Sequence, residues 1–221
     1  GMSGASPEQV LRFWFGAEWF DGGYDAPAYE RERVRFWFMG GAAVDVQCRE
    51  FIPRIRKAGR GELHGEEWKS RDGLVAQLVL LDQFSRNAFR GAPEAFAYDA
   101  RAVAVALQLI DKAGDRPASV PWPAALFIAT CLMHSEDLAQ HARVGAFCRA
   151  HVADSSRKSS NASSTSICPS TWRLSKNLGD THTATVCTGA RRRPPRPHGS
   201  RLTRHLVGAR ASNWRRRAEG A

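Results

Sequence analysis

The sequence predicts an all-α fold of antiparallel helix pairs, followed by a disordered basic tail. Apolar residues recur at helical spacing in roughly six to eight segments between residues 6 and 151. No segment in that range alternates apolar and polar residues with β-branched side chains, which is the pattern of a half-buried strand. Short breaks containing glycine or proline separate the segments, and short connections favour antiparallel neighbours.

The net charge of +10 belongs to the tail and not to the predicted helical domain. From Ala153 to Ala221 the chain has 14 Lys and Arg against 3 Asp and Glu, whereas the residues before it have 18 against 19. The tail has serine runs, the segment RRRPPRP and only two aromatic residues. Such a composition cannot bury enough apolar surface to offset the entropy lost on ordering. We therefore expect a helical domain over residues 6–151 and a low-complexity basic tail over residues 152–221.

The first predicted helix begins close to the N-terminus and is rich in aromatic residues. Ser6 is its predicted N-cap, Pro7 its first helical residue, and Gln9 can complete a capping box. Gly16 is a plausible end of this helix. The many aromatic residues around it are expected to pack onto later helices.

Six further helices are predicted, each bounded by capping or breaking residues. Pro53 should kink or end one of them, and residues 59–67 should form a loop. Ser70 can cap a helix carrying LVAQLVLLDQFSRN, which is apolar almost all round and so belongs at the centre of the fold. Asp99 is the predicted cap of the helix after it. The expected helices span residues 27–39, 42–57, 71–87, 100–113, 124–133 and 136–151.

The segment LLDQFSRNAFRG, residues 80–91, places charged and amide groups inside apolar helical sequence. Asp82 and Arg86 are four residues apart, so they share a helix face and can pair, and two further polar pairs in the segment repeat this spacing. Buried charges need partners, which predicts a hydrogen-bond network. It could be a pocket for a small anionic ligand, since arginine presents a planar fork of donors, or a structural network joining helices. The candidate binding residues here are Asp82, Gln83, Arg86, Asn87 and Arg90.

The segment MHSEDLAQ, residues 133–140, is the second polar stretch. Ser135 can cap the following helix, and acidic residues in its first turn complement the helix dipole. His134 could be a general base, a ligand or a satisfied core histidine. In an enzyme, His134 would be the base and Asp82 or Glu136 would orient it. Candidate catalytic residues are His134 and Glu136, and candidate binding residues are His134, Ser135, Asp137 and Gln140.

Several common functional classes have no signal in the sequence. The five cysteines are an odd number without CxxC spacing, and the pattern HxxDxxxH that begins at His134 is no established zinc motif, so no metal is expected. Phosphate-loop, dinucleotide, hydrolase and metalloprotease motifs are missing, and no cofactor is expected. No apolar run suggests a membrane span or a signal peptide, so we expect a cytoplasmic protein without a membrane partner.

The quoted segments resemble a bacterial family of unknown function, the DUF924 proteins. The resemblance covers about residues 7–150 and rests on five motifs: FWFG at 13–16, Trp19-Phe20, LLDQFSRNAFRG, AFAYD at 95–99 and MHSEDLAQ. It implies an all-helical fold similar to TPR-like right-handed superhelices, with a groove that binds a peptide, a protein or a small ligand. The positions that match the family motifs are Asp82, Gln83, Arg86, Asn87, Arg90, His134, Ser135, Glu136, Asp137 and Gln140.

The tail departs from that family pattern, which continues with a segment like RFGRFPHRN and a further helix. Runs of Ser, Arg, Pro and Thr are what a GC-rich gene yields out of frame, so one hypothesis is that the tail is a shifted reading frame. The nucleotide sequence across codons 150–160 tests it. As written, the tail could bind nucleic acid, but RRRPPRP has no interleaved aromatic residues and no partner fold, which argues against nucleic acid as a partner. The leading expectation is a scaffold that binds a small anionic ligand, a peptide or a protein.

Overall fold

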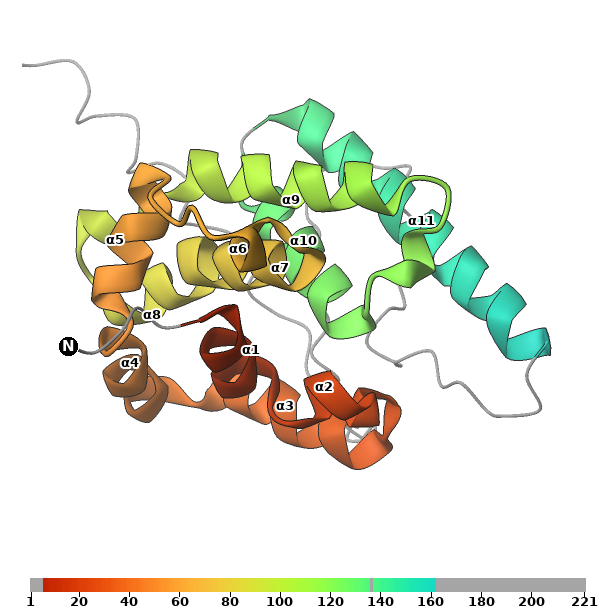
Figure 1. The fold of residues 1–221 in the computed structure, drawn as a ribbon, viewed down its shortest axis with the longest axis horizontal. Helices are drawn as coiled ribbons and strands as arrows, with labels where there is room; N and C mark the ends of the chain where they lie inside the picture. The colour runs from red at the N-terminus through yellow and green to blue at the C-terminus, as the bar shows by residue number, and fades with distance from the viewer. Residues whose placement is uncertain (1–5, 136, 162–221) are drawn as a thin grey trace, which may run out of the picture. The chain divides into compact units, whose positions relative to one another are not determined.

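The computed structural model describes residues 6–135 and 137–161, with side chains through residue 155 (Figure 1). The all-α prediction is confirmed for these residues, which include no strand. The α-helices are connected by the short 3-10 helices η1(Gly23–Asp25), η3(Pro93–Phe96) and η4(Pro117–Ser119) and by one π-helical turn, η2(Leu80–Phe84). The α-helices are α1(Pro7–Phe15), α2(Glu18–Asp21), α3(Pro27–Met39), α4(Gly41–Arg49), α5(Ile52–Arg60), α6(Glu66–Lys69), α7(Arg71–Val79), α8(Ser85–Ala88), α9(Asp99–Ala113), α10(Trp122–Met133) and α11(Leu138–Asn161).

Helix α7 lies at the centre of the fold, as its uniformly apolar sequence predicts. Every residue from 73 to 79 is buried. Helix α9 runs above α7 and helix α1 below it in Figure 1, and both pack against α7. The predicted cap is present, because the Ser70 hydroxyl accepts a hydrogen bond from the Gly73 N–H at 2.9 Å.

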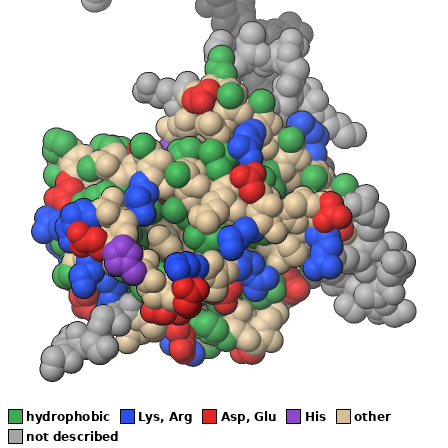
Figure 2. Space-filling model, turned by 45° about the horizontal axis from the view of Figure 1, so that its top comes forward, with side chains coloured by type: hydrophobic (Ala, Val, Ile, Leu, Met, Phe, Trp, Pro, Cys, Tyr) green, Lys and Arg blue, Asp and Glu red, His purple; other side chains and the backbone are tan. Residues whose placement is uncertain are grey.

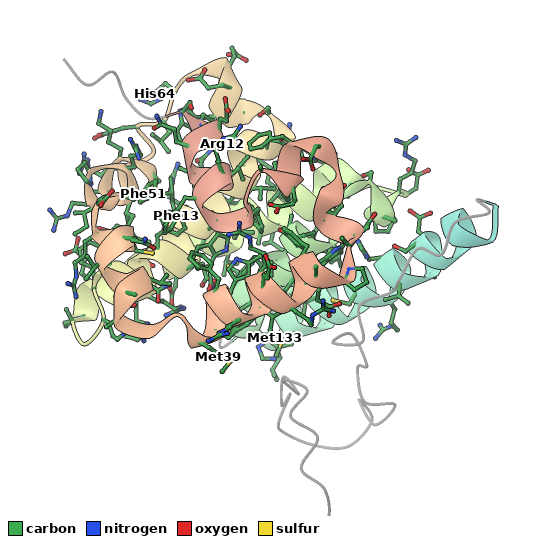
Figure 3. The ribbon with its side chains drawn as sticks, turned by 90° about the horizontal axis from the view of Figure 1, so that it is seen from below. Arg12, Phe13, Met39, Phe51, His64 and Met133 are labelled. Atoms are coloured by element: carbon green, nitrogen blue, oxygen red, sulfur yellow. The ribbon has the colours of Figure 1, made fainter. Side chains whose placement is uncertain are left out.

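Aromatic side chains from both halves of the described chain form the core next to α7. The Trp14 ring lies 5.1 Å from Phe84 and 5.6 Å from Phe127, measured between ring centroids. Phe13 and Phe51, both labelled in Figure 3, are 5.1 Å apart. The early aromatic residues therefore pack onto later helices, as expected, and hold α1 against the centre.

Two predicted helices differ clearly in their bounds from the helices of the structure, apart from the π turn described below. The helix expected over residues 42–57 is split into α4 and α5, because Pro53 lacks an N–H and fits only the first turn of a new helix. The last helix was expected to end at residue 151, but α11 continues to Asn161 through a sequence without Gly or Pro. The Asp154 carboxylate accepts a hydrogen bond from the Ala118 N–H at 3.0 Å, which ties this extension to η4(Pro117–Ser119). The predicted tail from residue 162 onward lies outside the described residues.

The predicted N-terminal capping box is not formed, although the helix starts at the predicted residue. Ser6 has the extended backbone of an N-cap residue, but its side chain makes no capping hydrogen bond. The side-chain oxygen of Gln9 instead accepts a hydrogen bond from Arg54 at 3.3 Å. The helix therefore starts at the extended Ser6–Pro7 step without side-chain capping.

Helix pairing follows the chain order in the second half of the described residues, whereas the first half combines a sequential pair, α6 with α7, with pairs of helices that are distant in sequence. In the second half, α9 packs on α10 and α10 packs on α11. In the first half, α1 packs on α7 and α4 packs on α8, so the partners are distant in sequence. The TPR-like superhelix stays a prediction. Among the described helices, none has the length and apolar character needed to cross a bilayer.

Candidate functional site

The first polar segment lies on one helical rod that is interrupted by a π turn. Helix α7 continues through η2 into α8, and within η2 the Ser85 N–H donates to the Leu80 carbonyl, five residues earlier. Such a turn accommodates one extra residue and rotates the rest of the rod by roughly 100° relative to an unbroken α-helix. Isolated π turns are frequent at functional sites. Asp82 lies in the middle of this one.

Asp82 is a buried carboxylate with three polar partners. Its residue is 1 % exposed. One oxygen, Oδ1, lies 2.9 Å from Nδ1 of His134 and 3.4 Å from Nη2 of Arg86. The other oxygen, Oδ2, accepts a hydrogen bond from the side chain of Gln83. These contacts compensate a negative charge that would otherwise be costly to bury. They also join Asp82 to His134, which is 52 positions away in the sequence.

Arg86 lies between two carboxylates. Its Nη2 donates to both oxygens of Asp99, at 3.1 and 3.0 Å, which are shorter distances than the one to Asp82. Its guanidinium also covers the ring of Phe96, 4.9 Å from the centroid. One positive charge therefore faces two negative charges. The Nε of Arg86 is buried and has no partner among the described residues.

His134 places one ring nitrogen, Nδ1, against the buried Asp82 carboxylate. Its side chain is 35 % exposed and follows directly after Met133, which Figure 3 labels. Arg86 Nη2 lies 3.2 Å from Nδ1, but a guanidinium can only donate, whereas the closer Asp82 oxygen can only accept when ionised. We assign the proton to Nδ1 on this basis, which leaves the lone pair on Nε2. No described residue bonds Nε2.

The hydrogen-bonded residues described so far form the first cluster: Asp82, Gln83, Arg86, Asp99 and His134. A second cluster adjoins it and consists of Arg90, Asn87 and Asp45. Arg90 holds the 5 % exposed Asp45 with two hydrogen bonds, from Nε at 2.6 Å and from Nη2 at 2.8 Å. Arg90 also donates to Asn87 Oδ1, and Asn87 donates to the Gln83 carbonyl at 2.9 Å. The fork of Arg90 is therefore already occupied by a carboxylate.

Three predicted site residues have a local role at the start of α11. The Ser135 hydroxyl accepts from the Asp137 N–H at 3.1 Å, and Asp137 Oδ1 accepts from the Ala139 N–H at 2.8 Å. Gln140 donates to the other oxygen of Asp137 at 3.2 Å. No hydrogen bond joins these residues to Asp82 in the part of the chain that is described. Glu136 lies outside the described residues.

Sequence reasoning missed two carboxylates of these clusters. Asp99 was predicted to cap α9, but Tyr98 occupies the N-cap position and the Asp99 carboxylate binds Arg86. The motif AFAYD was the signal that could have identified it. Asp45 had no signal in the sequence, because 45 residues separate it from Arg90.

Cys131 is buried next to the first cluster, and this position disfavours the thiolate form of its side chain. Burial raises the pKa of this thiol, and the carboxylates of Asp82 and Asp99 raise it further. Among the described residues, no group of three or more metal-ligating side chains has the arrangement of a metal site.

Comparisons with known proteins identify one family. The family described as "Bacterial protein of unknown function (DUF924)" matches residues 10–186, a range that contains both polar segments and passes the expected end of the resemblance near residue 150. Neither the curated proteins nor the solved structures gave a match. Since the match covers well over half of the chain, the chain belongs to the DUF924 family.

Proposed function

We propose that the first cluster is an acid–base site at which Nε2 of His134 accepts a proton from a small polar ligand or from water bound beside it. One observation carries this proposal: the buried Asp82 carboxylate lies 2.9 Å from Nδ1 of a histidine that is 35 % exposed. A carboxylate in that position fixes the tautomer and the ring orientation, and it stabilises the imidazolium that forms on proton transfer.

The same geometry disfavours a simple anion pocket at the two arginines. Arg86 contacts the carboxylates of Asp82 and Asp99, and the fork of Arg90 is filled by Asp45. Apart from His134, the first cluster contains two carboxylates, Asp82 and Asp99, and one guanidinium, that of Arg86. An anionic ligand would have to displace an existing carboxylate, whereas a proton donor would not.

Cleavage of p-nitrophenyl acetate, a small neutral ester, tests the proposal in the full-length chain. The reaction consumes one water and releases acetate and p-nitrophenol. We expect His134→Gln to lower the rate at least about tenfold, because general-base catalysis contributes roughly 10²–10⁴-fold. Asp82→Asn should also lower the rate, because the neutral amide no longer stabilises the protonated ring.

His141→Gln is the matched control. The Nε2 of His141 already bonds the Ser135 carbonyl at 2.7 Å, so this substitution should leave the rate unchanged. Near-ultraviolet circular dichroism would establish that each variant is folded. A His134→Gln chain that is folded and cleaves the ester as fast as the unaltered chain would refute the proposal.

A second candidate function is binding without catalysis, in which a small anionic ligand, a peptide or a protein docks at this site. The Nε of Arg86 supports it, because this donor has no partner among the described residues; it is buried, so a ligand group could bond it only after the Arg86 side chain moved. Calorimetric titration with inorganic phosphate distinguishes this binding function from the acid–base site. Phosphate binding that is lost in Arg86→Gln supports the binding function.

We also propose a cytoplasmic setting and a TPR-like scaffold for this site. The described cysteines are free and buried, which suits a reducing compartment. The consecutive packing of α9, α10 and α11 suits a helical repeat. Figure 2 shows basic, acidic and apolar side chains side by side on one face, and such a mixed surface does not favour nucleic-acid binding there.

A further inference from the structure

A cavity of about 420 Å³ opens between α6, α7 and α9, and it shares no residue with the His134 site. Its volume falls in the range of roughly 300–1,000 Å³ that is typical of small-molecule sites. Trp68, Leu74 and Val105 supply apolar walls. Three cationic residues, Lys69, Arg101 and Lys112, line it, and no carboxylate does.

The cations gather at two ends of this cavity. Arg101 and Lys112 are both on α9, eleven residues apart, which places their backbones about 16 Å apart along the helix axis. Lys112 Nζ lies 3.4 Å from the Lys69 carbonyl, so the two lysines belong to the same end. Ala104, Val105 and Gln108 lie between the ends on the same face of α9.

The three cationic residues at this cavity are exposed to solvent, and only Lys69 pairs with a carboxylate among the described residues. Lys69 pairs with Glu66, but the Glu66 side chain is 85 % exposed, and such surface pairs are weak. Arg101 has no carboxylate partner among the described residues. Its guanidinium lies over Gly61, where a Cβ atom would come within 2.8 Å of Nη2, so the absence of a side chain there makes room for it.

The middle of the cavity is preformed. Trp68 is only 5 % exposed, and its carbonyl accepts a hydrogen bond from Gln77 Nε2 at 2.9 Å, within the fold. This bond fixes α6 against the central helix α7. A ligand would therefore meet an ordered apolar wall and would not lose affinity to the ordering of that wall.

We propose that this cavity binds an elongated organic dianion, with an apolar middle and an anionic group at each end. One anionic group faces the guanidinium fork of Arg101, which suits a carboxylate. The other faces the ammonium groups of Lys69 and Lys112. The apolar middle lies against Trp68, Leu74 and Val105.

Isothermal titration of the full-length chain with a length series tests this proposal. The probes are adipate and sebacate, which are linear dicarboxylates of different length, and decanoate, which has the chain length of sebacate but only one carboxylate. We expect sebacate to bind at least about tenfold more tightly than either, because only sebacate reaches both ends with charge. Equal binding of all three, or no saturable binding of sebacate up to about 10 mM, would overturn the proposal.

Arg101→Gln and Lys112→Gln test the two ends separately, and Arg116→Gln is the matched control. Arg116 is exposed and does not line the cavity, and its substitution removes the same unit of charge. Arg101→Gln should reduce sebacate affinity to that of decanoate, while Arg116→Gln should keep the preference. The proposal fails if Arg101→Gln and Arg116→Gln bind sebacate equally while both remain folded. Ester cleavage at His134 should be unchanged in all three variants.

Discussion

At the scale of single residues, two buried aspartates organise the polar side chains around α8. Asp82 is 1 % exposed and Asp45 is 5 % exposed. A carboxylate removed from water needs compensating donors, so each one fixes its neighbours: His134, Arg86 and Gln83 around Asp82, and Arg90 around Asp45. Removing a donor should therefore cost more than the hydrogen bond alone.

We expect Arg90→Ala to lower the free energy of unfolding by about 1–3 kcal/mol, because it leaves the Asp45 carboxylate buried without the two hydrogen bonds that Arg90 donates to it. The Arg90 side chain is 59 % exposed, so water can reach part of the pair, and this keeps the expected loss below that of a fully buried pair. Urea denaturation measures the change. With Asp45→Asn already in place, the cost of Arg90→Ala should fall below about 1 kcal/mol. An equal cost in both backgrounds would mean that the pair does not stabilise the fold.

Spacing in the sequence predicted part of this arrangement. The interval of four residues correctly paired Asp82 with Arg86, but the shorter contact of Arg86 is with Asp99, 13 residues along the chain. The partner of Arg90 is 45 residues away. Helical periodicity constrains neighbours on one helix and carries no information on which distant carboxylate will face them.

At the scale of elements, the π turn η2 determines which way the polar residues face. At the end of this turn the buried Ser85 hydroxyl donates to the Leu81 carbonyl at 2.6 Å and lies 3.3 Å from the Asp82 carbonyl. Helix ends such as Gly16 and caps such as Ser70 were predictable, because their signals are local. The π turn was not predictable, because nothing in LLDQF distinguishes it from an ordinary α-helical turn.

Ser85→Ala should lower the free energy of unfolding by about 1–2 kcal/mol, because the buried Leu81 carbonyl loses this hydroxyl donor. The matched control is Thr130→Ala, which removes a similar bond to the Leu126 carbonyl within the regular helix α10. That change should be nearly neutral, since such back-bonding does not stabilise a regular helix. Thermal and urea unfolding of both variants provide the comparison. Equal losses would show that the hydroxyl is not specific to the π turn.

At the scale of the whole described domain, stability should decline at alkaline pH. Burial raises the pKa of the Cys48 and Cys148 thiols to about 12, whereas a thiol in an unfolded chain has a pKa near 8.5. The unfolded state therefore loses these protons first. The stabilisation is complete below about pH 8.5 and is lost as pH rises toward 12.

We expect the free energy of unfolding, measured by urea denaturation between about pH 7 and pH 10, to fall above about pH 8.5. Replacing both Cys48 and Cys148 by Ala should reduce this decline, and the buried Cys131 thiol, whose pKa is also raised, should retain part of it. A slope that is unchanged in the double variant would assign the alkaline loss to other groups.

The same core also gives the domain an optical property. Trp14, Trp19, Trp37, Trp68 and Trp122 are all no more than 9 % exposed, and they come from five different helices. Each indole is shielded from water only while those helices stay together, so the fluorescence emission of the folded domain should lie at short wavelength. Unfolding should shift it to the red in a single step. The chain therefore contains its own fluorescent reporter of the packing among these five helices, with no label attached.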